Sequence, residues 1–295
     1  MRSGVRTVLG FVPLLALLAL GAAMLCADRD WYVRRRIERL EWTAMDTCAA
    51  VQCRGGDQEA AKRLRTRVAD SFDWVARTFN RFDATSEVRR LSPLADGEVL
   101  AAADVSECYA AAFDLMRRSG GAFNPRWGGP RTLDLGAIAK GYAVDVAATN
   151  LVADADILID LGGNLKSVRG NWRTGVRDPS GDGYAANVEL RTGEALATSA
   201  TYYRGRHIFD GRTGIAVTNG VASVTVLHPA SAMMADGLST TLFVLGPEAG
   251  LAFVREHAPE AAVLWVMEDA SCVSFDPSGR FRVLRVKSKQ GGNER

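Results

Sequence analysis

Apolar residues recur at helical spacing in two segments of the first half of the chain. The first, over residues 68–79, predicts a long amphipathic helix that follows the polar break at 54–57. The second predicts a helix over 101–118, which is ended by Gly120 and the glycine after it. Residues 81–92 are rich in turn formers, so we expect an irregular crossing between the two helices.

Short apolar runs bounded by Gly, Asp or Pro predict strands, and most of them lie in the second half of the chain. Strands are expected at 40–51, 157–161, 170–177, 187–191, 195–199, 221–227, 261–267 and 281–286. The three runs from 170 to 199 are predicted to form an antiparallel meander, and the last two a closing pair. Further helices are expected at 138–152, 231–245 and 251–257. Together they predict an α+β fold, with mixed or antiparallel sheets and flanking helices in two merged lobes.

The first residues differ in composition from the rest. Residues 8–27 are uncharged and mostly apolar, and the run is long enough to cross a bilayer as a helix. A cleaved signal peptide usually has a shorter apolar region that ends at a small-x-small site. A lipoprotein signal would need small residues before Cys26, where this chain has Met24 and Leu25. We therefore predict an uncleaved membrane anchor with a basic flank at 1–39, one domain at 40–286 and a polar tail at 287–295.

The composition is that of a globular protein. Of the 295 residues, 47% are hydrophobic and 24% are charged, and the formal net charge is +2. Basic residues are interspersed with acidic ones and form no stripe with aromatic residues, which argues against a nucleic-acid-binding surface. Cys48, Cys53, Cys108 and Cys272 match no zinc-site spacing. They are expected to be small buried side chains, with a disulfide between Cys48 and Cys53 left open.

The predicted helix at 231–245 carries three oxygen-bearing side chains on one face. Asp236, Ser239 and Thr240 are separated by three and four residues, so they project in the same direction. A carboxylate with two hydroxyls is a set of hard oxygen ligands that suits magnesium better than zinc. The alternative is a solvated or capping face, which polar residues on a helix commonly form.

The segment DLGAIAKGYAVD combines a helix start with two glycines. Asp134 is placed to cap the helix, and Ile138 and Tyr142 recur on a face that would point to the core. Gly136 and Gly141 leave the amides of the first turn open to a ligand. The alternative is an ordinary capped helix that packs through small residues.

DLGAIAKGYAVD resembles the signature helix of the ApbE family, the FAD:protein FMN transferases. Four further blocks follow in that family's order: GAFN at 121–124, IDLGGN at 159–164, ATSATYYRGRHIFDGRTG at 197–214 and SVTVLHPASAMMADGLSTTLFVLG at 223–246. The resemblance covers residues 42–286 and implies an ApbE-like fold. It also implies magnesium-dependent transfer of the FMN part of FAD to a Thr or Ser hydroxyl of an acceptor protein, such as a subunit of a membrane redox complex, with release of AMP.

The resemblance also carries the family's site residues to positions of this sequence. Flavin contacts are expected at Met45, Phe82, Ala122, Phe123, Asn124, Asp134, Lys140 and Phe209. The metal would be held by Asp236, Ser239, Thr240 and the backbone carbonyl of Ala137. His207 lies in a matching block, and an imidazole suits a general base near neutral pH, so it is expected to take the acceptor's proton. Asp210 is the other candidate for this role.

The sequence departs from the family pattern in four places. The family's Met-Gly-Thr is Met-Asp-Thr at 45–47, GAFD is GAFN, HIIDPRTG is HIFDGRTG, and the threonine-bearing continuation of GAFD is Pro-Arg-Trp at 125–127. Because the changes at Asp46 and Asn124 fall near flavin contacts, flavin binding or delivery without catalysis stays open as an alternative function. A second alternative is hydrolysis of FAD to FMN and AMP, with water as the acceptor. The Gly-Gly-Asn loop at 162–164 is either an amide nest for a phosphate or a tight exit from a strand.

The expected orientation in the membrane rests on two opposed indications. Five arginines at 29–39 follow the apolar run and outnumber the two before it, which by the positive-inside rule would keep the domain in the cytoplasm. The resemblance implies the opposite, since bacterial members of the family mostly work outside the cytoplasmic membrane. We follow the family and expect an inner-membrane protein with its catalytic domain on the periplasmic side.

Overall fold

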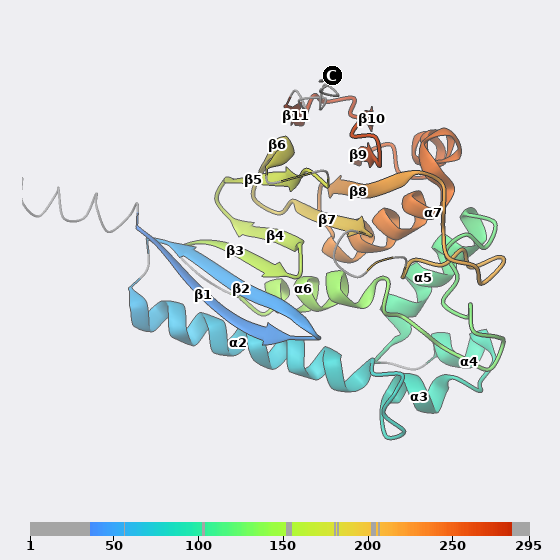
Figure 1. The fold of residues 1–295 in the computed structure, drawn as a ribbon. Coiled ribbons are helices and arrows are strands. Elements are labelled where there is room, and N and C mark those ends of the chain that lie inside the picture. The colour runs from blue at the N-terminus through green and yellow to red at the C-terminus, as the bar shows by residue number, and fades with distance from the viewer. Residues whose placement is uncertain are drawn as a thin grey trace, which may run out of the picture.

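The computed structural model describes residues 36–55, 57–101, 104–151, 155–179, 181, 183–201, 205 and 207–284. Within these ranges the chain forms two antiparallel sheets, with helices packed on the larger one (Figure 1). The larger sheet has eight strands in the order β1 (Ile37–Ala44), β2 (Thr47–Arg54), β3 (Asp156–Leu161), β4 (Asn164–Arg169), β7 (Ala195–Ala200), β8 (Val221–His228), β9 (Ala262–Met267) and β10 (Cys272–Phe275). The smaller sheet has three, in the order β11 (Phe281–Val283), β6 (Tyr184–Leu190) and β5 (Trp172–Arg177).

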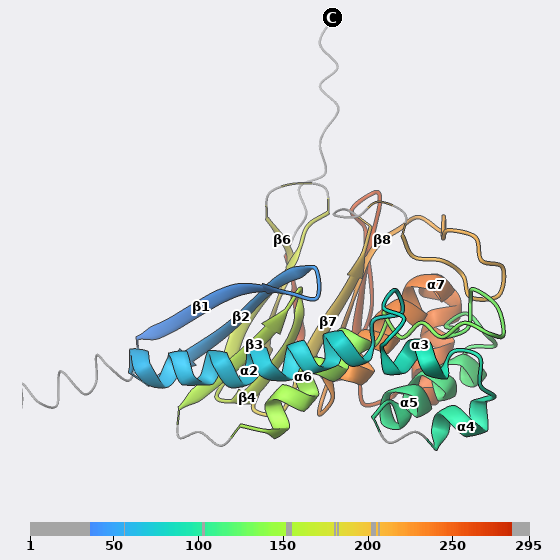
Figure 2. The same ribbon diagram turned by 90° about the horizontal axis from the view of Figure 1, so that it is seen from below.

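The larger sheet is covered on both faces. Its helices are α2 (Gln58–Thr78), α6 (Ala139–Thr149) and α7 (Ala232–His257), and one hydrophobic core lies between them and the strands (Figures 1 and 2). A second core lies between the two sheets, where Trp172 and Leu190 pack with Leu227 and Leu264. Every residue of β8 is buried, as expected for a strand between two apolar layers. Three shorter helices complete the fold: α3 (Glu87–Leu91), α4 (Asp96–Leu100) and α5 (Ser106–Arg118).

The long helix predicted before Phe79 is confirmed as α2. Asp57 caps it by accepting a hydrogen bond from the Ala60 amide at 2.6 Å, and this satisfies one of the free N–H groups of the first turn. The stripe that includes Phe72 and Val75 is fully buried. Trp42 on β1 stacks on Phe72 with ring centroids 5.9 Å apart, so α2 is held against the first strands.

Helix α7 contains both helices predicted between 231 and 257, joined across a kink. The kink falls at Gly246, whose φ is 72°, and Pro247 follows it. The side-chain amide of Asn219 donates to the Phe243 carbonyl at 2.8 Å, so that carbonyl has a partner near the break. By length and composition α7 is apolar enough to cross a membrane, but most of it is buried inside the protein, and we interpret it as a core helix.

Three of the predicted element boundaries are wrong. The strand expected at 40–51 is the β1–β2 hairpin, turned at Met45 and Asp46 with φ values of 48° and 57°. Positive φ at both central residues gives a tight two-residue turn, which the pattern of apolar residues does not reveal because they continue on both sides of it. The irregular crossing contains helix α3, capped by Ser86, and the helix expected from residue 101 begins at Ser106.

Two predicted strand pairings are also wrong. β5 and β6 pair as expected, but β7 leaves them and lies between β4 and β8 in the larger sheet. β9 pairs with β8 and β10, whereas β11 pairs with β6 in the smaller sheet. β4 was not predicted at all, because charged and polar residues interrupt its short apolar pattern. Periodicity indicates that a strand exists, but it does not choose the partner.

The described cysteines are all free. Cys53 and Cys108 are buried, as expected, whereas Cys48 is exposed. Cys48 and Cys53 are five positions apart on β2, so their side chains point to opposite faces and cannot form the disulfide that was left open. The predicted anchor at 8–27 and the tail at 287–295 lie outside the described residues.

Candidate active site

The contact between α6 and α7 depends on Gly141. Its backbone amide donates to Asp236 Oδ2 at 2.9 Å. A Cβ at this position would lie 2.2 Å from the Ala232 carbonyl oxygen and 2.7 Å from Asp236 Cβ. The two helices can therefore approach this closely only because residue 141 has no side chain. The expectation that the Gly141 amide is open to a ligand is wrong, since a neighbouring helix already occupies it.

Asp236 lies inside the protein, with 5% of its surface exposed, so the reading of its helix face as solvated is wrong. Burial raises the pKa of this carboxyl group, while Lys140 and the Gly141 amide act in the opposite direction. The Lys140 ammonium is 3.9 Å from Asp236 Oδ2, which is at the limit of an ion pair. A cation beside this carboxylate would therefore stabilise its charged form.

Two hydroxyls on α7 meet a third hydroxyl from β7. Ser199 Oγ lies 2.7 Å from Ser239 Oγ and 3.1 Å from Thr240 Oγ1. Ser239 Oγ also donates to the backbone carbonyl of Asp236 at 2.8 Å. Ser239 and Thr240, two of the three predicted metal-binding residues on α7, are thus brought together, and Ser199 is added to them. Sequence reasoning missed Ser199, although it stands in one of the matching blocks, because no periodicity links it to a helix 40 residues away.

Asp134 does not cap α6 as predicted. A turn at 135–138 separates it from the helix, whose N-cap position is Ile138 without a side-chain hydrogen bond. Asp134 Oδ1 instead accepts from the Gly136 amide at 2.9 Å. Its Oδ2 accepts from the indole Nε1 of Trp127 at 3.1 Å and lies 3.4 Å from the Arg81 guanidinium. The Asp134 carboxylate therefore holds the Trp127 ring and the Arg81 guanidinium in place.

The aromatic cluster consists of Phe82, Trp127 and Phe209 with Arg81 between two of the rings. Trp127 and Phe209 stack with centroids 5.3 Å apart and planes 2° from parallel. The Arg81 guanidinium lies 4.6 Å from the centre of Phe82 and 5.7 Å from that of Trp127. Phe82 is 83% exposed, which leaves a large aromatic face uncovered. Three predicted flavin contacts, Phe82, Asp134 and Phe209, thus come together through Trp127 and Arg81, which sequence reasoning did not assign to the site.

The block GAFN packs against the segment that carries Phe209. Ala122 and Phe123 are buried, and Asn124 Nδ2 donates to the Gly211 carbonyl at 3.1 Å. A Cβ at Gly211 would lie 2.5 Å from Asn124 Cβ, so glycine at this departure from the family pattern is needed for the contact. Met45 is in the β1–β2 turn and packs against the main core. In this arrangement Asn124 fastens two loops to each other.

The two candidate bases differ in their surroundings. His207 is exposed, and its Nδ1 lies 2.9 Å from the Gly205 carbonyl. Asp210 accepts three hydrogen bonds from the Arg212 guanidinium, and Arg212 lowers its pKa. Among the described residues no hydrogen bond or ion pair joins either of them to Asp236. Ala137 lies in the turn before α6 and is half-buried.

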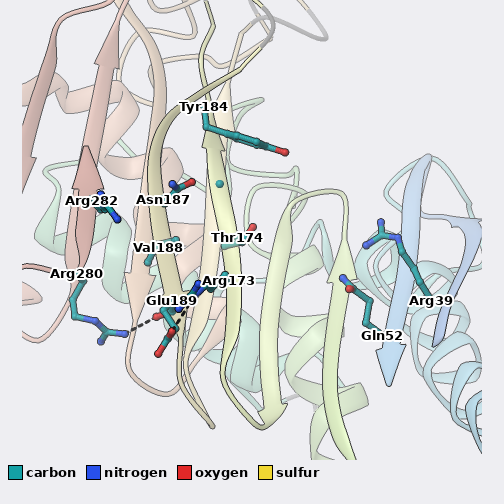
Figure 3. A pocket seen from close by; sticks show the side chains of 11 residues that line it. Arg39, Gln52, Arg173, Thr174, Tyr184, Asn187, Val188, Glu189, Arg280 and Arg282 are labelled. Atoms are coloured by element: carbon teal, nitrogen blue, oxygen red, sulfur yellow. Dashed lines mark hydrogen bonds and ion pairs between the residues drawn. The ribbon is translucent and has the colours of Figure 1, made fainter. Parts of the chain in front are cut away.

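A cavity in the described part of the chain lies away from these residues. It is a groove of about 730 Å³ between the β1–β2 hairpin and the smaller sheet, lined by Arg39, Gln52, Arg173, Tyr184 and Arg282 among others (Figure 3). None of the predicted site residues lines it. Four arginines line the groove, of which Arg39, Arg173 and Arg280 each pair with a nearby glutamate.

Comparison with known proteins identifies the same region. The ApbE family profile matches residues 128–265. A FAD:protein FMN transferase of Vibrio cholerae is 38% identical over 141 residues, 42% of each chain, and one of Rhodobacter capsulatus is 39% identical over 169 residues, 52% of this chain and 32% of that protein. This chain therefore matches less than half the length of these curated relatives.

The fold resembles solved ApbE structures over a longer range. The flavin transferase ApbE of Vibrio cholerae aligns with a TM-score of 0.64 at 24% identity, over 81% of this chain and 97% of that one. The apo flavinyl transferase ApbE of Pseudomonas stutzeri aligns with the same TM-score at 25% identity, over 81% and 94% of the two chains. The segment that the family profile matches contains α6, the three hydroxyls of Ser199, Ser239 and Thr240, and the whole of α7. The chain is thus similar to the ApbE family in its fold and, by sequence, over residues 128–265.

Proposed function

We propose that this protein transfers the FMN part of FAD to a Thr or Ser hydroxyl of an acceptor protein and releases AMP. The observation that carries the proposal is the buried Asp236 carboxylate beside Lys140, with the Ser239 and Thr240 hydroxyls on the next turn of the same helix. The curated relatives that the chain resembles are FAD:protein FMN transferases, which agrees with it.

The residues on α7 fit a magnesium ion. Asp236 supplies one carboxylate whose burial favours a nearby positive charge, and Ser239 and Thr240 supply neutral hard oxygens. The Ala137 carbonyl, at the start of the same helix contact, would complete the protein ligands. When bound, the ion would neutralise charge on the pyrophosphate of FAD, which is the main requirement of phosphoryl transfer.

The aromatic cluster and Lys140 would hold FAD. Its isoalloxazine is a large flat ring, and the exposed face of Phe82 and the stacked Trp127 and Phe209 offer flat apolar surfaces next to each other. Lys140 would place its ammonium at the phosphates. Asp134 accepts a hydrogen bond from Trp127, and Arg81 lies over Phe82 and Trp127, so these groups would orient the ring relative to Asp236.

In the proposed reaction the acceptor oxygen forms a bond to the phosphorus of the FMN part. The bond from that phosphorus to the bridging oxygen breaks, and AMP leaves with the bonding electron pair. His207 takes the proton of the acceptor hydroxyl. Its exposed position suits a residue that meets another protein, whereas Asp210 is already paired with Arg212.

The proposal also includes location: the segment 8–27 anchors the protein in the inner membrane, with the domain on the periplasmic side. Protease added to spheroplasts should then digest the domain, and a protected domain would indicate the cytoplasmic orientation that the arginines at 29–39 favour.

The direct test of activity uses the full chain in detergent, FAD and magnesium, with and without a candidate acceptor. AMP release that depends on the acceptor, together with a flavin-fluorescent acceptor band in a denaturing gel, is the expected result. AMP and FMN without any acceptor would mean hydrolysis. Tight FAD binding with no AMP under either condition would mean a flavin-binding or delivery protein.

A further inference from the structure

Asp145, the last residue of DLGAIAKGYAVD, receives four hydrogen bonds. It lies on α6, and its Oδ2 accepts from Ser231 Oγ at 2.8 Å and from the Met233 amide at 2.9 Å. Its Oδ1 accepts from the Ala232 amide at 3.0 Å and from Lys166 Nζ at 2.6 Å. Three of these donors belong to the start of α7, so a carboxylate of one helix caps another.

Helix α7 has its own N-cap residue as well as the Asp145 carboxylate. Ser231 caps the helix in the ordinary way, with its Oγ accepting from the Met234 amide at 3.1 Å. Lys166 on β4 pairs with Asp145 and also donates to the Ala230 carbonyl at 2.6 Å. The beginning of α7 is therefore fixed to both α6 and the sheet. A negative charge at this end of a helix is also favoured by the helix dipole.

A second contact of the same kind joins the two helices. It lies one turn toward the start of α6 and one turn toward the end of α7. Asp145 and Gly141 are four residues apart on α6, and Ala232 and Asp236 are four residues apart on α7. Asp145 accepts from the Ala232 amide, and Asp236 accepts from the Gly141 amide. Each helix thus gives a carboxylate to the other. One helical turn separates the two contacts on α6 and also on α7. If the contact of Asp145 with the start of α7 is lost, the Gly141 amide and the Asp236 carboxylate are therefore expected to move relative to each other.

We propose that Asp145 is a positioning residue: it holds the Asp236 carboxylate of α7 against the start of α6, and it thereby determines the affinity of the site for a cation. This inference rests on the proposed function, in which Asp236 binds magnesium. Hydrogen-bond partners behind metal ligands commonly change metal affinity by about 10- to 100-fold when they are lost. Asp145 acts through the helix contact, so an effect near the lower end, about tenfold, is expected.

The test uses Asp145→Asn in the full-length protein. Asparagine has the same shape but no charge, and its amide nitrogen cannot accept the hydrogen bonds that one carboxylate oxygen accepts. The apparent Kd for magnesium, measured without FAD by calorimetry or by the magnesium-induced rise in Tm, should increase about tenfold. At saturating magnesium the rate of AMP release should return to within a few-fold of the wild type. An unchanged magnesium Kd would overturn the proposal and leave Asp145 as a helix cap only.

Asp57→Asn is the matched control, because Asp57 is also a carboxylate cap, on α2, where it accepts from the Ala60 amide. It should lower Tm without changing magnesium binding, and an equal loss of affinity in this variant would contradict the assignment. If Asp145→Asn does not fold, Lys166→Met keeps the carboxylate and the three contacts to α7. It should weaken magnesium binding in the same direction by about twofold to threefold, and no change there would equally refute the proposal.

Amide hydrogen exchange separates this inference from the proposed function. In the metal-free protein the Gly141 amide donates to Asp236, so its exchange reports on the second contact directly. Exchange at Gly141 should be at least about tenfold faster in Asp145→Asn than in the wild type or in Asp57→Asn. If the wild type binds no magnesium but exchange still follows this pattern, the metal site is wrong and the positioning of Asp236 stands. Equal exchange in all three proteins would refute the positioning role itself.

Discussion

Replacing Gly141 with alanine should destabilise the protein although alanine is the better helix former. The added Cβ would lie 2.2 Å from the Ala232 carbonyl oxygen, 2.6 Å from its carbon and 2.7 Å from Asp236 Cβ. Two of these three atoms are backbone, so the clash cannot be relieved by rotating a side chain, and α6 must move away from α7. The movement also lengthens the hydrogen bond from the Gly141 amide to Asp236.

The expected magnitude follows from three opposing contributions. Overpacking of a well-packed contact costs about 1–3 kcal/mol. Loss of a hydrogen bond to a charged group costs about 1.5–3 kcal/mol. Alanine in place of glycine inside a helix returns about 1 kcal/mol. The free energy of unfolding should therefore fall by about 1.5–5 kcal/mol, and Tm should fall by about 2–4 °C for each kcal/mol in a domain of this size.

Urea unfolding followed by circular dichroism measures this change, and Gly97→Ala is its control. Gly97 is also in a helix, α4, but a Cβ there would meet no atom within 4 Å. That variant should be unchanged or more stable by up to about 1 kcal/mol, because only the helix propensity changes. A Gly141→Ala protein as stable as the wild type, or a Gly97→Ala protein that is equally destabilised, would refute the packing argument.

Four further predictions concern named side chains. Asp236→Ala should abolish magnesium-dependent AMP release, and activity without magnesium binding in this variant would contradict the metal assignment. His207→Gln should bind FAD with nearly unchanged Kd but transfer FMN about a hundredfold to ten-thousandfold more slowly, whereas a weaker Kd with an unchanged rate at saturating FAD would make His207 a flavin contact. Arg126→Lys should lower the free energy of unfolding by about 3 kcal/mol. Arg126 donates to the carbonyls of Ser92 and Leu94 and to Asp96, and the single ammonium of lysine cannot make all of these hydrogen bonds. A loss below about 1 kcal/mol in urea unfolding would disprove this prediction. Burial raises the pKa of Asp236 above its ordinary 3.8, so the stability that this carboxyl group contributes to the metal-free protein should be fully present below pH 3.8 and lost as pH rises through the folded-state pKa. Magnesium binding should weaken as pH falls through the same folded-state pKa. A Tm difference between wild type and Asp236→Asn that does not vary with pH would contradict this prediction.

Those parts of the fold and site that depend on local periodicity could be predicted from the sequence. The stripe that ends at Phe79 gave α2, and the spacing of Asp236, Ser239 and Thr240 placed them on one face of a helix. Periodicity does not indicate whether a polar face points outward or inward, so the burial of Asp236 was not foreseen.

Contacts between distant segments could not be predicted in this way. Trp127 stacks on Phe209, and Ser199 meets Ser239, across long stretches of chain whose only link is the folded sheet. The same limit explains the errors in strand pairing, because β7 has the same alternation whether its neighbour is β6 or β4. The order of the family blocks supplied residue identities at these places, but not the contacts that hold them.

The order of strands in the larger sheet has a consequence for how the chain folds during synthesis. β2 pairs with β3, and Arg54 and Asp156 on these strands are 102 residues apart. The β1–β2 hairpin therefore leaves the ribosome long before its partner strand exists, with one edge unpaired. Helix α2 follows at once, and the contact of Trp42 with Phe72 lets it cover the apolar face of the hairpin early. The edge stays open until β3 is made, so non-local pairing should limit the folding rate, and partly made chains are exposed to edge-to-edge association.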